Sequence, residues 1–327
     1  MAYSREVVRR AREQLAQAKE DRESENRQHL AEAYAKLPRL KEIDLELRRT
    51  MAAAAQAAFL SGADGREAME QVKQANLALQ QERADLAARY FPEGYLDESP
   101  VCEKCGGSGY IGTNMCECLQ ELCRQEQKRE LTFLTGGRET FNQFRLDYYS
   151  DRMDPKIGTS PRQIMEKTLM KCRNYAFSFS LSAGNMLFSG GTGLGKTFLS
   201  ACIARVVADR GYSVVYESAP HLFSKLEAAK FNPNPENRRE AAGFTDCDLL
   251  IVDDLGTEMP GQFTTAALYT LINDRLLTGK PMLVSTNFNM EELNKRYSPQ
   301  ISSRLQGSFS LMMFVGEDIR ILKNRGY

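Results

Sequence analysis

The chain of 327 residues has no excess of charge of either sign, because 43 lysines and arginines balance 43 aspartates and glutamates. A zero formal net charge creates no global basic field, so any contact with nucleic acid requires a local basic patch. The sequence also lacks an apolar run of about 20 residues, which argues against a membrane-spanning helix. Residues 1–25 are dense in charge, unlike a secretory signal. We therefore expect a cytoplasmic protein of about two domains.

The first 90 residues contain a single proline, Pro38, and are rich in alanine, glutamate, glutamine and arginine. Three thin apolar stripes at helical spacing predict three helices, with breaks near Pro38 and at residues 61–65. Helices with such narrow apolar faces can pack on one another in a small bundle. They can also lay a face against another protein, and the two arrangements are compatible. We expect residues 1–90 to form a helical partner-docking region.

Cysteines are unevenly distributed, and five of the eight fall between residues 102 and 123 with no histidine among them. Without a secretory signal, such a cluster indicates a metal site more than a disulfide framework. Four thiolates can surround a structural Zn²⁺, although free thiols or a redox pair are alternatives. The expected ligands are Cys102, Cys105, Cys116 and Cys118; Cys123 is an alternative to Cys116 or Cys118, because C-x-C is a tight chelate. Residues 91–135 are thus predicted to be a cysteine-rich zinc module and linker.

Residues 185–197 read N-M-L-F-S-G-G-T-G-L-G-K-T and contain the phosphate-binding pattern G-x-x-x-x-G-K-[ST]. Glycines let the backbone wrap around a phosphate, and its N–H groups and the start of the next helix then face the anion. Lysine adds a point charge, and threonine offers a hydroxyl to Mg²⁺. A chance glycine turn is disfavoured, because an apolar strand precedes the pattern and an amphipathic helix follows it. The expected nucleotide contacts are Gly190, Gly191, Thr192, Gly193, Leu194, Gly195, Lys196, Thr197 and Phe198.

Two acids, Asp253 and Asp254, end an apolar run that starts at residue 249. With the phosphate loop upstream, we expect Asp253 to hold Mg²⁺ together with Thr197, and Asp254 to orient or deprotonate the attacking water. The alternative is a buried strand that ends in a polar turn. Asn287 follows the next predicted strand, at residues 282–286, and is expected to position water between the acids and the γ-phosphate.

Apolar runs and helical patterns alternate over the last 190 residues, which predicts a parallel α/β sheet with ligands at the carboxyl ends of its strands. Further strands are expected at residues 212–216 and 311–315. Helices are expected at residues 160–181, 221–243 (interrupted by F-N-P-N-P), 263–277 and 299–305. Residues 124–160 carry five aromatic side chains that either cover an adenine ring or pack the edge of the domain: Phe133, Phe141, Phe144, Tyr148 and Tyr149.

The stretches G-G-T-G-L-G-K-T-F-L, L-L-I-V-D-D-L-G-T-E, V-S-T-N and S-S-R-L-Q-G together resemble the AAA+ ATPases of the bacterial replicative-helicase loader group, of DnaC and DnaI type. The resemblance is strongest over residues 140–327 and implies an AAA+ core at residues 136–327. It implies ATP and Mg²⁺ as cofactors, a DnaB-type helicase and single-stranded DNA as partners, and a homo-oligomer. It also implies that Asp253 and Asp254 are the Walker B acids, Asn287 is sensor 1, Arg304 is the arginine finger and Arg320 is a sensor 2 equivalent.

Two departures from the family pattern affect these expectations. Asp254 stands where most AAA+ proteins have glutamate, which suggests slow ATP turnover. The sequence ends about ten residues after the last predicted strand, so no C-terminal helical lid is expected.

The segment that faces DNA in loaders corresponds to residues 222–244, which are either a DNA-tracking surface or a solvated helix face. Its basic and aromatic members are Lys225, Lys230, Phe231, Arg238 and Arg239.

Two other functions compete with the loader. A transposition helper ATPase of the IstB type shares the same core, but the cysteine cluster and the helical N-terminus favour the loader. A zinc-stabilised adaptor with a purely structural ATP site is disfavoured by the intact set of Lys196, Asp253, Asn287 and Arg304.

Overall fold

The computed structural model describes residues 3–57, 63–135, 139–155 and 158–324, without the side chains of residues 51–57, 63–68 and 132–135. The chain divides into two compact units, Met1–Arg12 with Leu119–Tyr327, and Glu13–Cys118. The boundaries expected from composition were residues 90/91 and 135/136. Within the described residues, no helix is both long and apolar enough to cross a membrane.

A five-stranded sheet in the order β4-β5-β6-β3-β7 forms the centre of the larger unit. All four pairings are parallel, so the carboxyl ends of the strands share one edge of the sheet. The parallel sheet predicted from the sequence is confirmed. The strands are β3 (Asn185–Ser189), β4 (Val214–Ser218), β5 (Leu249–Leu255), β6 (Met282–Thr286) and β7 (Phe309–Met313).

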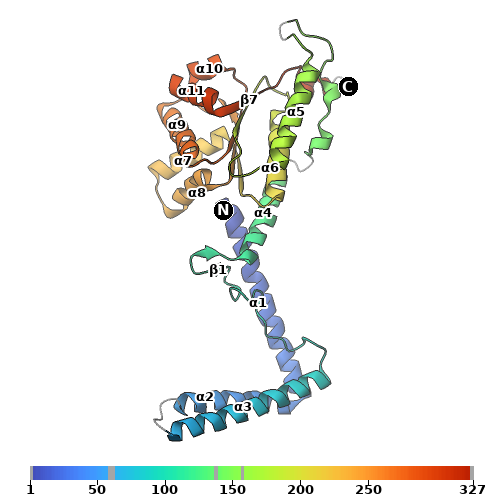
Figure 1. The fold of residues 1–327 in the computed structure, drawn as a ribbon, viewed down its shortest axis with the longest axis vertical. Helices are drawn as coiled ribbons and strands as arrows, with labels where there is room; N and C mark the ends of the chain where they lie inside the picture. Colours follow the sequence, from blue (N-terminus) through green and yellow to red (C-terminus); the bar gives the residue numbers. More distant parts are fainter. Residues whose placement is uncertain (1–2, 58–62, 136–138, 156–157, 325–327) are drawn as a thin grey trace. The chain divides into compact units, whose positions relative to one another are not determined.

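Helices cover both faces of this sheet, as Figure 1 shows and as its continuous apolar strands require. On one face, α5 (Pro161–Phe177) and α6 (Lys196–Asp209) pack on alternate strand residues such as Phe188 and Ile251. The other face packs Leu187 and Val252 against a second set of helices. That set is α7 (Ala219–Phe231), α8 (Pro235–Asp246), α9 (Gln262–Leu277), α10 (Met290–Arg296) and α11 (Pro299–Ser308).

The predicted helix at residues 160–181 begins as expected, because the Ser160 side chain accepts the Gln163 N–H and Pro161 occupies the first turn. Its predicted end was wrong, since Ser178 already caps the helix. The strands expected at 212–216 and 311–315 lie two residues later and two residues earlier, at 214–218 and 309–313. Just before the first of these strands, the carbonyl of Ser213 accepts the N–H groups of both Asp248 and Leu249.

Two helices were absent from the sequence analysis. Helix α10 is short and begins with a reciprocal capping box between Asn289 and Glu292. Helix α4 (Glu117–Thr135) begins within the cysteine cluster. After β7, the described residues form one further helix, α12 (Ile319–Asn324), and two 3₁₀ turns precede α5, at Phe141–Gln143 and Leu146–Tyr148.

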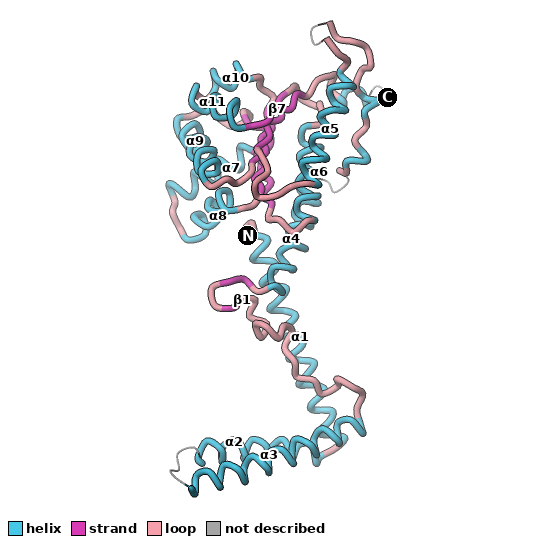
Figure 2. Tube along the Cα trace, viewed as in Figure 1, coloured by secondary structure: helices cyan, strands magenta, loops and turns pink. Residues whose placement is uncertain are grey.

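The N-terminal helices are α1 (Arg5–Lys36), α2 (Pro38–Ala57) and α3 (Ala63–Tyr90), so the predicted break at Pro38 is confirmed. The predicted break at residues 61–65 lies partly outside the described residues. Helices α2 and α3 lie side by side (Figure 1), joined by ion pairs Arg39–Glu82 at 2.8 Å and Arg83–Asp44 at 2.7 Å. Figure 2 shows the short hairpin of β1 (Tyr110–Ile111) and β2 (Asn114–Met115) within the cysteine-rich loop.

Candidate functional site

The glycine-rich loop connects the end of β3 to the start of α6, as the phosphate-binding pattern requires. Gly195 has a φ of 88° and caps the helix, whose first residue is Lys196. The loop is held from outside by the Tyr149 hydroxyl, which donates to the Leu194 carbonyl at 3.0 Å, and by the Ile319 N–H, which donates to the Gly193 carbonyl at 3.0 Å. This backbone is therefore shaped by residues both before and after it in the chain.

Two glycines in the loop are required by their surroundings. At Gly190, with φ of 154°, an added Cβ would lie 2.2 Å from the Phe314 carbonyl oxygen. At Gly193, with φ of 70°, it would lie 1.9 Å from a carboxylate oxygen of Asp318. A side chain at Gly190 would overlap backbone, so this position requires glycine, whereas a side chain at Gly193 would have to displace the Asp318 carboxylate.

The Lys196 side chain lies inside the loop and is 5% exposed. Its Nζ donates to the carbonyls of Gly190 and Gly191, both at 2.6 Å, and to Oδ1 of Asn287 at 2.7 Å. Asn287 follows β6, so the structure brings the predicted sensor residue and the predicted phosphate lysine into direct contact.

The two acids at the end of β5 point in different directions. The pairing register with β6 shifts between Val252 and Leu255, and this irregularity contains both acids. Asp254 has a φ of 55° and, among the described residues, is the only non-glycine with positive φ. Bulges of this kind re-aim side chains beside functional sites. Asp254 faces the cavity described next, whereas Asp253 is buried at 6% exposure.

A cavity of about 310 Å³ lies at the carboxyl edge of the sheet. Polar groups from four segments meet in it, namely the segment before α5, the phosphate loop, the strand ends and α12. Of the predicted site residues, the ones that line it are Thr192, Gly193, Leu194, Gly195, Lys196, Thr197, Phe198, Asp254, Asn287 and Arg320. Gly190, Gly191, Asp253 and Arg304 are not on its wall.

The electrostatics of the cavity follow from burial. Burial lowers the pKa of Lys196, against the opposing effect of Asp254 and Asp253. Burial also raises the pKa of Asp254, and the nearby Asp253 carboxylate adds to this shift. One acid, two lysines and two arginines thus line a partly desolvated space, with Asp253 buried next to Asp254 in the chain, a composition that suits a polyphosphate with a divalent cation.

Aromatic residues from the segment before α5 form one wall of the cavity. Phe144, Tyr148 and Tyr149 line it, whereas Phe141 packs in the core beneath, and the Phe133 side chain lies outside the described residues. Gln143, Arg145, Ile319 and Lys323 also line the cavity and were not predicted. No local motif marks these four, because tertiary folding alone brings them to the loop.

Arg304 lies on α11, away from this cavity. Its guanidinium is 4.4 Å from the centroid of the Tyr269 ring and donates to the Tyr269 hydroxyl at 2.8 Å and to Oδ1 of Asn273 at 3.4 Å. The residue therefore does not serve the nucleotide cavity of its own chain in this structure.

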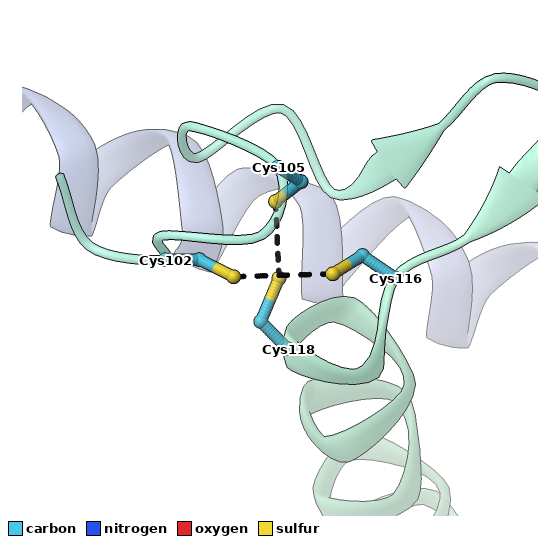
Figure 3. A group of neighbouring side chains, drawn as sticks. All are labelled: Cys102, Cys105, Cys116 and Cys118. Atoms are coloured by element: carbon cyan, nitrogen blue, oxygen red, sulfur yellow. Dashed lines mark hydrogen bonds between the residues drawn. The ribbon is translucent and has the colours of Figure 1, made fainter.

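The four cysteines expected to bind zinc come together in the smaller unit, with their sulfurs pointing toward one another (Figure 3). The Sγ atoms all lie within 4.8 Å of one another, with Cys102–Cys116 at 3.8 Å and Cys105–Cys118 at 3.5 Å. Tetrahedral zinc with Zn–S bonds of about 2.3 Å places sulfurs about 3.8 Å apart, so this donor set fits the metal. Cys123 is buried elsewhere and is not a member of the group.

Comparisons with known proteins agree with this site. Residues 160–301 match the family model described as IstB-like ATP binding protein. The replicative helicase loader DnaC of Escherichia coli (strain K12) is 25% identical over 150 residues, which are 46% of this chain and 61% of that protein. A putative ATP-binding protein in an insertion sequence of Mycobacterium tuberculosis (strain ATCC 25618 / H37Rv) is 31% identical over 109 residues, 33% of this chain and 42% of that protein.

A crystal structure of DnaI superposes with a TM-score of 0.44 at 19% identity, covering 58% of this chain and 92% of the other. The chain spans about three fifths of the length of the helicase loader that it matches. Residues 160–301 therefore match an IstB-like ATP-binding domain, and the parallel sheet and the phosphate loop predicted from the sequence are confirmed.

Proposed function

We propose that this protein is an ATP-dependent loader of a replicative DNA helicase, acting on single-stranded DNA in replication. The observation that carries the nucleotide part is the cavity where the phosphate loop meets Lys196, Thr197, Asp254 and Asn287. The loader part is supported by the similarity to a protein described as a replicative helicase loader.

Within the cavity, we assign the loop N–H groups and Lys196 to the phosphates of ATP. Thr197 and Asp253 would supply oxygen ligands of the kind that Mg²⁺ prefers, and the cation would offset the negative charge of the phosphates. Asp254 faces the cavity and is assigned to the attacking water, with Asn287 beside it. A slow ATPase is expected, because aspartate reaches less far than the usual glutamate.

Substitution of Lys196 tests the nucleotide assignment. We expect Lys196→Ala to bind ATP about 100-fold more weakly, because charge-assisted hydrogen bonds contribute about 1.5–3 kcal/mol each. The matched control is Lys280→Ala, whose ammonium donates to the Asp246 carbonyl at 2.6 Å, outside the cavity. Titration with a fluorescent ATP analogue measures both. An unchanged ATP affinity in Lys196→Ala would refute the assignment of this lysine to the phosphates.

We also propose that the cysteine group holds one structural Zn²⁺. The fit of the four sulfurs to a tetrahedron supports this proposal. A bound metal would also supply folding free energy to a loop whose strands, β1 and β2, are only two residues long each.

Helicase docking is assigned to the N-terminal helices of residues 1–90. The α2–α3 pair supports this, because it presents large apolar side chains to solvent, with Leu45 46% and Leu77 55% exposed. Exposed leucines on a paired helix surface are suited to a partner helix. By this proposal, residues 91–135 connect the docking region to the ATPase domain of residues 136–327.

Capture of a DnaB-type helicase on the immobilised full-length chain tests the docking assignment. The double variant Leu45→Glu/Leu77→Glu should reduce helicase affinity at least about tenfold, since buried apolar anchors each contribute more than about 1 kcal/mol. ATP affinity should not change. The control is Met170→Glu, which alters a 56% exposed side chain on α5. Equal helicase affinity in the double variant and the wild type would refute the assignment.

Contact with single-stranded DNA is assigned to residues 222–244. Phe231 supports it, being 67% exposed and paired with Phe263 at 5.7 Å between ring centroids, with the Lys230 ammonium over both rings. An exposed aromatic with a cation suits base stacking. Lys225 is occupied by ion pairs with Glu217 at 2.6 Å and Glu240 at 3.1 Å.

A transposition helper ATPase is the second candidate, favoured by the IstB-like family match and by the relative from an insertion sequence. The same capture experiment separates the two functions. Recovery of a transposase in place of a helicase would transfer the proposal to that class, and the nucleotide assignments would stand in either case.

A further inference from the structure

The buried acid Asp253 is held by hydroxyl groups from both neighbouring strands. Tyr216 on β4 donates to its Oδ2 at 2.7 Å, and Ser285 on β6 donates to its Oδ1. Both partners are fixed by the sheet, since β4 pairs with β5 in register from Val214 to Ser218 and Ser285 is completely buried. Each carboxylate oxygen thus has one donor from the protein.

Ser285 also links the two acids to each other. Its Oγ donates to Asp253 and accepts the backbone N–H of Asp254 at 2.9 Å. This bond lies at the irregular end of β5, where Asp254 has its positive φ. The same hydroxyl therefore holds one carboxylate inward and anchors the turn that directs the other toward the cavity.

We propose that Tyr216 and Ser285 are positioning residues for the nucleotide-bound cation: they hold the buried Asp253 in one orientation, which leaves its remaining acceptor capacity for the cation or its water shell. This inference rests on the proposed ATP-binding function. A carboxylate oxygen has about two acceptor directions, so one hydroxyl on each oxygen leaves capacity for a further contact. Removal of a hydrogen-bond partner that orients a metal-binding carboxylate typically changes metal affinity 10- to 100-fold.

A purely structural role makes a different prediction. If the hydroxyls only satisfied a buried carboxylate, their removal would lower thermal stability without altering the response to Mg²⁺. The chain contains a matched control for this distinction. Tyr297 donates to the buried carboxylate of Glu258 at 2.5 Å and does not line the nucleotide cavity.

The experiment compares full-length wild type, Tyr216→Phe, Ser285→Ala and Tyr297→Phe. A fluorescent ATP analogue is titrated in EDTA and at increasing Mg²⁺, and thermal unfolding is recorded for each protein. We expect the Mg²⁺ concentration for half-maximal enhancement of nucleotide affinity to rise about tenfold in Tyr216→Phe and in Ser285→Ala. The nucleotide affinity in EDTA should not change in any of the variants. Tyr297→Phe should have a lower melting temperature and an unchanged response to Mg²⁺.

The outcomes separate the inference from the function on which it rests. If the wild type binds no nucleotide, or binds it without any Mg²⁺ enhancement, the proposed function fails. If the wild type responds to Mg²⁺ and Tyr216→Phe responds at the same concentration, the positioning role is overturned. Should Tyr216→Phe not fold, the same comparison is decided by Ser285→Ala.

Discussion

At the scale of single residues, Glu130 is a partly buried acid without a full counter-charge, so its contribution to the stability of the fold depends on pH. This α4 side chain accepts a hydrogen bond from the Ser4 hydroxyl at 3.0 Å. Burial raises its pKa, while Ser4, Arg10 and Lys225 act in the opposite direction. A carboxyl whose folded pKa is raised contributes stability below its unfolded pKa, and this contribution is lost as the pH rises through the folded pKa.

We therefore expect Glu130→Gln to be more stable than the wild type at pH 7 to 8, because the amide avoids burying a charge. The difference should shrink as the pH falls through the raised pKa of Glu130 and the wild-type carboxyl gains its proton. Thermal unfolding across this range measures it, with the exposed Glu166→Gln on α5 as control. A difference that does not vary with pH would contradict this account.

At the scale of elements, the open edge of β4 is closed by a side chain rather than by another strand. Buried Gln127 of α4 donates to the Tyr212 carbonyl at 3.0 Å and accepts the Val214 N–H at 2.9 Å. It thus replaces the two backbone partners that a neighbouring strand would supply. Edge strands covered in this way are protected from pairing with other chains.

Gln127→Leu should lower the melting temperature by about 5 °C, because two hydrogen bonds contribute about 2 kcal/mol in total and a buried N–H loses its partner. Gln125→Leu on the exposed side of the same helix is the control, with little expected change. Thermal unfolding with a light-scattering readout tests both the loss of stability and the exposed edge. Equal melting temperatures for the two variants would refute the role of Gln127.

The cysteine-rich loop is the second element with a direct test. Cys118→Ser should reduce the bound zinc from one per chain to a small fraction, since three thiolates no longer close the tetrahedron. Cys123→Ser should retain the full metal content, because Cys123 lies outside the group of four. Elemental analysis after purification under reducing conditions distinguishes them. The reverse result would make Cys123 the fourth ligand.

At the scale of the whole molecule, Arg304 connects the chain to its proposed assembly. Its guanidinium lies against Tyr269 on α9 and away from the cavity of its own chain, and we propose that it exchanges these contacts for the nucleotide of a neighbouring subunit. Arginine is always charged and presents a planar fork to phosphate oxygens. Supplied from a neighbour, it can raise the rate about 10³-fold or more.

Arg304→Ala should therefore bind ATP normally and hydrolyse it poorly. The specific ATPase rate of the wild type should rise with protein concentration. Mixing Arg304→Ala with Lys196→Ala should recover some activity, because the second variant still offers its arginine to an intact site. If both variants assemble and the mixture stays inactive, the role in trans is wrong.

The sequence by itself determined the features that depend on local properties of the chain. Strand and helix periodicity, the Ser160 cap and the phosphate-loop motif are encoded within a few neighbouring residues, and the structure confirms them. Only the tertiary structure decided which side chains meet. Cys118 rather than Cys123 completes the sulfur group, and the irregular end of β5 turns Asp254 toward the cavity while Tyr216 and Ser285 bind Asp253. The reason is physical: these contacts join residues that lie 13 to 37 positions apart, so their geometry exists only after the strands have paired and the loop has closed.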